Sequence, residues 1–179
     1  GQYLERTMSY IVSEHFNLKN YNLSIPGAGL DQCYRVLKYH VENINSDTVV
    51  LLAPEASRRV FYTEYLEGLL TANSIKDKVV DRQTDGNLDS SFLSEVFFKL
   101  YSNEYEMFLH VNKNIDAIKY ICEKHNKRLI IMKNPQYYLE KDSIDLTKEV
   151  WTPNDLAADL CHFGAKGQKV IANKIISKF

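Results

Sequence analysis

Two side chains near the C-terminal end of the chain could act together as a general base and its partner. Asp159 and His162 are three residues apart and precede a predicted helix, so both can emerge on one side of a turn. A histidine placed in this way can take a proton from a hydroxyl, while the carboxylate orients the imidazole and stabilises its charged form. The spacing alone is ordinary in a chain with 5 histidines, so its meaning depends on what surrounds it.

A metal site is the alternative use of the same turn. Asp159, Cys161 and His162 all carry side chains that can bind a metal ion. Residues this close in one turn rarely converge on a single ion, and no second pair of ligands is evident in the sequence. We therefore expect no metal site.

A glycine loop could supply a second element of an active site. Residues 26–29 read Pro-Gly-Ala-Gly, between a predicted strand at 20–24 and a predicted helix that Asp31 can cap. Because glycine lets the main chain approach a ligand closely, the N–H of Gly27 could donate to a developing oxyanion. The alternative is that Gly27 and Gly29 only make a turn. A nucleotide-binding loop is disfavoured, because Gln32 occupies the place of the third glycine in G-x-G-x-x-G.

The elements that must position these residues alternate between helix and strand. Helical periodicity predicts helices at 4–17, 31–41, 60–70, 92–100, 105–124 and 165–179. Apolar runs predict strands at 48–53 and 127–132 and a short edge strand at 144–146, with the first typical of a strand buried on both faces. Residues 71–91 are polar and predict a lid-like loop.

This order predicts one α/β domain over residues 1–179, in which helices cover both faces of a parallel sheet. Ligands of such sheets bind beyond the carboxyl ends of the strands. We therefore expect one edge of the molecule to carry the loops at 26–29, 54–59, 135–138 and 159–162.

Composition limits the class of partner. The net charge is -1, with 22 basic and 23 acidic residues interleaved along the chain. This balance predicts neither nucleic-acid nor membrane-surface binding and favours a neutral or weakly polar small molecule as the ligand. No apolar run reaches the roughly 20 residues of a membrane span. Three widely spaced cysteines favour reduced thiols in a cytosol-like compartment.

Two segments resemble the SGNH (GDSL-type) hydrolase family. Residues 159–175 are similar to its final block, Asp-x-x-His before a closing helix, with Phe163 where proline is usual. Residues 21–29 are similar to its second block, with Gly27 at the oxyanion glycine. The resemblance implies a flavodoxin-like, three-layer α/β/α fold and a serine esterase of O-acyl esters, for example of an acylated carbohydrate. In that scheme Asp159 orients His162, and no cofactor is needed.

The chain departs from the family at two places. The family's Gly-Asp-Ser nucleophile block would precede the helix expected near Leu4 and is not among these residues, and Ala56 stands where the third block has an Asn donor. Ser57 and Arg58 could face the site instead, although a solvated loop is the alternative for them. Trp151, with Tyr137 and Tyr138, could line a carbohydrate or acyl pocket, or else serve only in packing.

The first departure predicts an N-terminally truncated domain whose central strand lies upstream of Gly1, between the strands at 20–24 and 48–53. Direct pairing of those two strands would contradict this topology. With the upstream serine present, the sequence predicts a hydrolase. Without it, the alternative is a catalytically inactive SGNH-fold module for binding or assembly within a larger complex. A third alternative is a flavodoxin-like domain that binds nucleotide or flavin.

Overall fold

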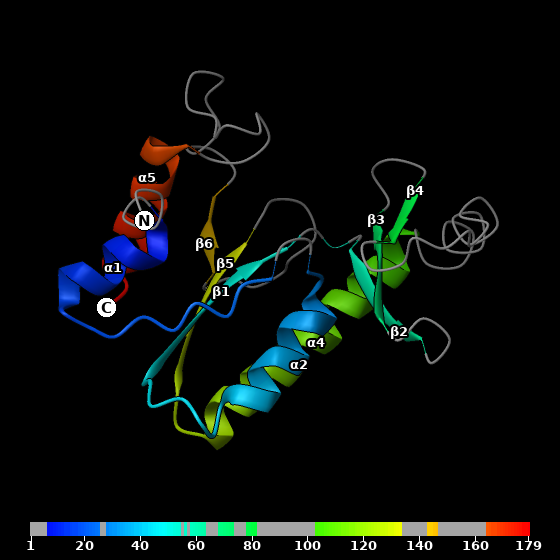
Figure 1. The fold of residues 1–179 in the computed structure, drawn as a ribbon, viewed down its shortest axis with the longest axis horizontal. Helices are drawn as coiled ribbons and strands as arrows, with labels where there is room; N and C mark the ends of the chain where they lie inside the picture. Colours follow the sequence, from blue (N-terminus) through cyan, green and yellow to red (C-terminus); the bar gives the residue numbers. More distant parts are fainter. Residues whose placement is uncertain are drawn as a thin grey trace.

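The structure is a computed structural model with mixed helix and strand content, in keeping with an α/β fold (Figure 1). A short parallel sheet lies at its centre, with helices on both of its faces, and a separate antiparallel sheet lies at one end. The model describes residues 7–25, 28–54, 56, 58–63, 68–73, 78–81, 103–133, 143–146 and 164–179.

The central sheet has the strand order β1-β5-β6. β1 (Thr48–Ala53) and β5 (Arg128–Lys133) run parallel along their whole length, with Thr48 opposite Arg128 and Ala53 opposite Lys133. β6 (Ile144–Asp145) adds a short parallel edge beside the end of β5. These positions confirm the three strands predicted from the apolar runs at 48–53, 127–132 and 144–146.

Helices α2 (Leu30–His40) and α4 (Glu104–Lys124) cover one face of this sheet (Figure 1). Leu51 and Ala53 of β1 and Ile131 of β5 point toward these helices, where they join a buried cluster with residues such as Val111 and Ile115. α4 confirms the helix predicted at 105–124, and it begins after Asn103, whose side chain accepts the N–H of Glu106 at 2.8 Å.

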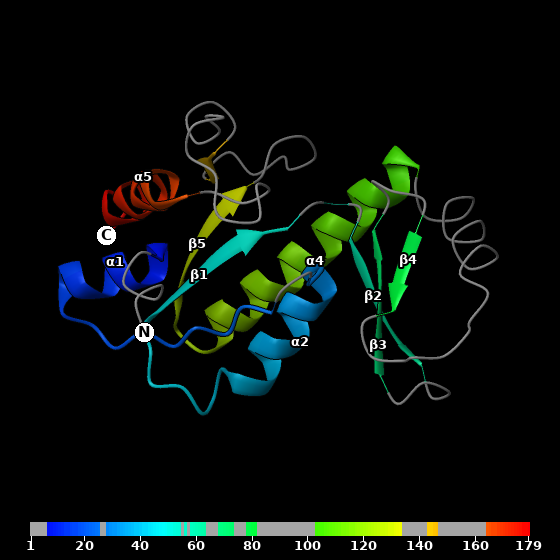
Figure 2. The same ribbon diagram turned by 45° about the horizontal axis from the view of Figure 1, so that its top comes forward.

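Helices α1 (Met8–Phe16) and α5 (Ala165–Ile176) lie on the opposite face (Figure 2). There they bury Ile130 and Met132, the alternate residues of β5. The end of α5 is tied to this layer, because the ring of Phe179 stacks on that of Phe16 at 4.6 Å between centroids. α5 therefore confirms the predicted closing helix, whose regular part ends at Ile176.

The α1–α5 layer stops short of β1. Val50 and Leu52 are 37% and 41% exposed, whereas Ile130 and Met132 on the same face of β5 are buried. Among the described residues, β1 is paired with β5 alone and its other edge is open. The prediction that β1 is buried on both faces is thus wrong for the face that α1 and α5 leave uncovered.

The N-terminal ends of two helices differ from prediction. Thr7 has an extended backbone, and its side chain accepts the N–H of Tyr10 at 3.4 Å, so α1 begins at Met8 rather than near Leu4. α2 begins one residue before Asp31, which makes Gly29 its N-cap in place of Asp31. At α1 the cap formed by the Thr7 side chain, rather than the apolar period, decides where the helix starts.

Residues 20–24 are not a strand, contrary to prediction. The segment 18–25 connects α1 to α2 without pairing with either strand of the central sheet, so the predicted strands at 20–24 and 48–53 are not hydrogen-bonded to each other. The side chain of Asn22 accepts the backbone N–H and the hydroxyl of Ser24, at 3.1 and 2.6 Å. These local bonds take the place of a ladder, since none of the described strands lies beside this segment in a sheet.

The helix predicted at 60–70 is also wrong. An antiparallel sheet occupies this part of the chain, with the order β2-β3-β4, formed by β2 (Arg59–Thr63), β3 (Gly68–Asn73) and β4 (Lys78–Asp81). The end of β3 and all of β4 fall within the predicted lid-like loop at 71–91. The run Val60-Phe61-Tyr62-Thr63 is rich in the β-branched and aromatic residues that favour strands, which outweighs a weak helical period.

The predicted helix at 92–100 lies outside the described residues. Within the described ranges, none of the helices combines the length and apolar character that crossing a bilayer requires.

Candidate functional site

The carboxyl end of β1 meets the beginning of α2. The chain leaves β1 at Ala53, and five residues later the backbone of Arg58 packs directly on Gly29, the N-cap of α2. A methyl group on Gly29 would lie 2.6 Å from the carbonyl oxygen of Arg58 and 2.7 Å from a carboxylate oxygen of Asp31. Contacts this short do not occur at real side chains, so glycine is required for this approach. The backbone angle φ of −92° at Gly29 is ordinary, and the requirement is one of space.

The beginnings of α1 and α5 meet on the other face. The backbone N–H of Met8, the first residue of α1, donates to Oε1 of Gln168 in the first turn of α5, at 3.0 Å. Such a bond fixes one of the N–H groups that a helix start leaves without a partner. α5 begins after Gly164, which caps it with an extended backbone. Figure 1 shows that α5 starts on the side of the molecule toward which β5 and β6 run.

The first turn of α2 holds a buried amide. Gln32 is 9% exposed, and its Oε1 is buried without a hydrogen-bond partner in the described part of the chain. Asp31 and Arg58 also place side-chain atoms in the interior here, and each of them takes part in further interactions. Because burying a polar atom without a partner costs free energy, the carbonyl oxygen of Gln32 stands out from the rest of the core.

Of the predicted site residues, only Arg58 is among the described ones. It is half-buried, and its backbone closes on the start of α2, so it is not simply part of a solvated loop. Ala56, at the position of the family's Asn donor, is a core residue with 3% exposure. The other predicted site residues lie outside the described part of the chain; they are Gly27, Ser57, Trp151, Asp159 and His162, and their roles remain predictions.

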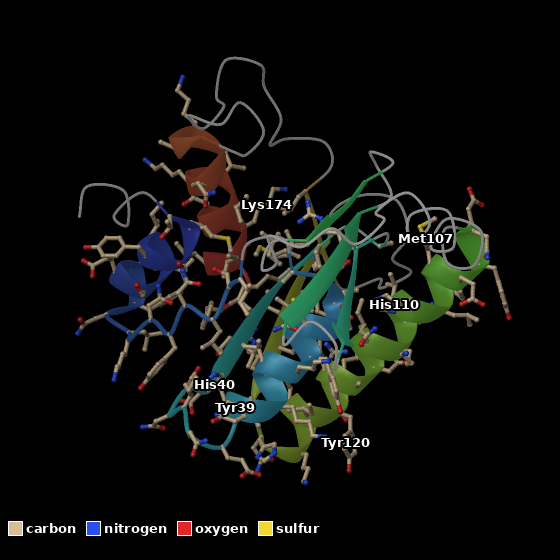
Figure 3. All side chains as sticks on the ribbon, turned by 45° about the vertical axis from the view of Figure 1, so that its right-hand side comes forward. Tyr39, His40, Met107, His110, Tyr120 and Lys174 are labelled. Carbon is tan, nitrogen blue, oxygen red and sulfur yellow. The ribbon has the colours of Figure 1, made fainter. Side chains whose placement is uncertain are left out.

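A buried polar pair on α4 was not singled out by the sequence. His110 and Asn114 are both buried, and Asn114 donates to the carbonyl oxygen of His110 at 2.8 Å, with its Nδ2 3.3 Å from the histidine Nδ1 (Figure 3). The sequence predicts His110 to be a surface or packing residue. The spacing of four on one helix face could have indicated the pair, because residues i and i+4 are neighbours.

Two cysteines of the described residues are free thiols packed in or against the α2–α4 core. Burial, with a smaller contribution from the carboxylate of Asp31, raises the pKa of the Cys33 thiol to about 11. Burial likewise raises the pKa of Cys122 to about 11, although nearby Lys127 acts in the opposite direction. Both thiols are therefore protonated near neutral pH, which makes them poor nucleophiles.

Within the described ranges, no three side chains of His, Cys, Asp or Glu gather as they would around a metal ion. Comparison with models of known protein families, with curated proteins and with solved structures finds no match to this chain.

Proposed function

We propose that this chain forms most of a serine ester hydrolase of the SGNH type, acting on O-acyl esters. In this proposal a serine upstream of Gly1 attacks the acyl carbonyl, and His162 takes its proton and returns it to the leaving alcohol. Asp159 orients His162, and the N–H of Gly27 stabilises the oxyanion. The reaction needs no metal or organic cofactor.

The bond between Met8 and Gln168 is the observation that carries the proposal. It joins the first turn of α1 to that of α5, so the first residues of the two helices lie side by side. His162 precedes the cap residue Gly164 by two positions, and two residues span at most about 7 Å. His162 would thus lie near the start of α1, the first helix after the proposed nucleophile.

The open side of β1 supports a further strand in the sheet. In the described part of the chain, one edge of β1 is unpaired and its apolar residues Val50 and Leu52 are exposed, as expected where a sheet continues, because parallel strands are normally buried on both faces. A parallel strand upstream of Gly1, between β1 and the segment 18–25, would connect to α1 through residues 1–7 and give the usual crossover. The serine would stand at the carboxyl end of that strand.

The contact of Gly29 with Arg58 supports the placement of the oxyanion loop. It holds the chain just after Gly27 against the loop that follows β1, at the carboxyl edge where α/β folds bind their ligands. With a net charge of -1 and no excess of either sign, the chain favours an uncharged ester, for which an acylated carbohydrate is our proposed substrate class.

Hydrolysis of p-nitrophenyl acetate by the polypeptide that includes the residues upstream of Gly1 tests the proposal. We expect turnover that falls about 10³-fold or more in His162→Ala, as for loss of one member of a catalytic triad. His15→Ala, an exposed histidine on α1, is the matched control and should retain full activity. Equal turnover in His162→Ala and the wild type would contradict the assignment of His162.

A non-catalytic module for binding or assembly is the second candidate. The burial of Ala56 in the core favours it, because the side-chain donor of the family's third block is then missing from this loop. A serine-directed fluorophosphonate separates the two candidates. Covalent labelling of the upstream serine, lost in His162→Ala, supports the hydrolase, whereas absence of both labelling and turnover supports the module. A flavin or nucleotide that copurifies would instead support a flavodoxin-like domain.

A further inference from the structure

Gln32 places an unsatisfied polar atom in the interior at the edge where the proposed active site lies. The residue is nine-tenths buried, and its Oε1 has no hydrogen-bond partner among the described residues. A buried acceptor without a partner costs free energy, because it loses its hydrogen bond to water. A leucine or methionine would fill the same position without that cost. The sequence therefore retains an amide where packing alone would favour an apolar side chain.

Gln32 belongs to the first turn of α2, as the third residue of the helix. Because helical side chains tend to point back toward the N-terminus, we expect its amide to lie near the beginning of α2. The same turn begins at Gly29, against which the backbone of Arg58 is packed. The first N–H groups of a helix have no partner within the helix, so polar groups gather at a turn of this kind.

A hydroxyl group is the ligand that suits this combination. The amide offers an oxygen that accepts and a nitrogen that donates, and rotation about its last bond exchanges them. A hydroxyl both donates and accepts, so it can pair with either orientation. An anion suits the site less well, because the carboxylate of Asp31 lies at the same helix start, 2.7 Å from where a Cβ of Gly29 would be.

We propose that Gln32 is a substrate-binding residue that takes a hydroxyl of the alcohol part of the ester. The inference rests on the proposed function for the identity of the ligand, and it makes the alcohol a polyol such as a sugar. The buried acceptor is then satisfied when the ligand is bound and costs stability when it is absent, as is common at functional sites.

The substitution Gln32→Met in the complete polypeptide tests this inference through binding and stability, without depending on turnover. Methyl β-glucoside is the probe, titrated while the backbone N–H signals of residues 30–32 are followed by NMR. We expect saturable shifts in the wild type and about tenfold weaker binding in Gln32→Met, together with a melting temperature about 2–4 °C higher. A fully O-methylated glucoside, which has no hydroxyl, should bind neither protein.

Gln168→Met is the matched control for stability. Its Oε1 accepts the N–H of Met8, so the same substitution should lower the melting temperature instead of raising it. A Gln32→Met variant that is more stable and binds the glucoside as well as the wild type would overturn the inference and leave only a buried water at Gln32. Absence of glucoside binding by the wild type, or a destabilised Gln32→Met variant, would also overturn it.

These outcomes are separate from the fate of the proposed function. Glucoside binding that depends on Gln32, without any ester hydrolysis, would support the binding site and remove the hydrolase. Ester hydrolysis by the wild type, with glucoside binding unchanged in Gln32→Met, would support the hydrolase and remove the binding site at Gln32.

Discussion

Replacing Gly29 with alanine should loosen the junction between β1 and α2. The new methyl group would lie 2.6 Å from the carbonyl oxygen of Arg58, and the neighbouring carbonyl carbon is 3.1 Å away. Because these atoms belong to the backbone, a side-chain rotation cannot relieve the clash. Overpacking of this kind costs about 1–3 kcal/mol. Alanine returns about 0.4–1 kcal/mol by restricting the unfolded chain, which leaves a net loss of about 1–2 kcal/mol.

For a chain of this length the loss corresponds to a melting temperature about 2–8 °C lower, which thermal unfolding followed by circular dichroism can measure. Gly164→Ala is the matched control, because Gly164 also caps a helix with an extended backbone and without a side-chain hydrogen bond. That variant should change stability by less than about 1 kcal/mol. If Gly29→Ala is as stable as the control, the loop after β1 does not pack on α2 as described.

Two further predictions concern residues away from the site. Lys127→Met should lower the free energy of unfolding in urea by about 2 kcal/mol, because the Lys127 ammonium donates to the carbonyl oxygens of Ile44 and Ser46 at 3.2 and 2.6 Å. Lys113 is exposed, so the control Lys113→Met should leave the free energy of unfolding unchanged. Equal values for the two variants would refute the role of these bonds. The thiol of Cys122 has a pKa of about 11 in the folded protein and 9.0 when unperturbed, so the unfolded chain loses this proton at lower pH. The free energy of unfolding should therefore fall by up to about 3 kcal/mol between pH 9 and 11. The same fall in Cys122→Ala would show that other groups cause it.

The parts of the fold that the sequence predicts well are those with strong local patterns. β1 and β5 are continuous apolar runs, and α4, which is 21 residues long, repeats its apolar residues from Met107 to Cys122 on the buried side. Each pattern matches only one kind of element buried in a core. The central sheet and its main helix could therefore be placed before the structure was known.

The parts that were predicted wrongly depend on weaker or more distant information. The hairpin strands β2 and β3 are short, and their apolar residues fit a helical period about as well as an alternating one. Residues 20–24 alternate as a strand should, but a strand also needs a neighbour to pair with. The start of α1 was decided by the side chain of Thr7, which competes locally with the apolar pattern.

The candidate site could be predicted only in outline. The sequence places the loops at 26–29 and 54–59 on one edge, and the contact of Gly29 with Arg58 shows that chain from both loops meets there. It could not indicate that Gly29 is needed for space or that Gln32 is buried without a partner, because both properties arise from packing between segments distant in the chain. From the sequence alone, Gln32 indicates only that residues 27–32 do not form a G-x-G-x-x-G nucleotide loop.

The pairing of β1 with β5 has a consequence for how the chain folds. The bond from Lys127 to Ser46 at the beginning of these strands joins residues 81 positions apart. Closing so long a loop costs entropy before any contact compensates for it, whereas α4 and the strands β2 to β4 form from nearer neighbours. We therefore expect the parallel pair to assemble late and to limit the folding rate. The junction of Gly29 with Arg58 stands at the end of β1, so the candidate site would take its shape only in that last step.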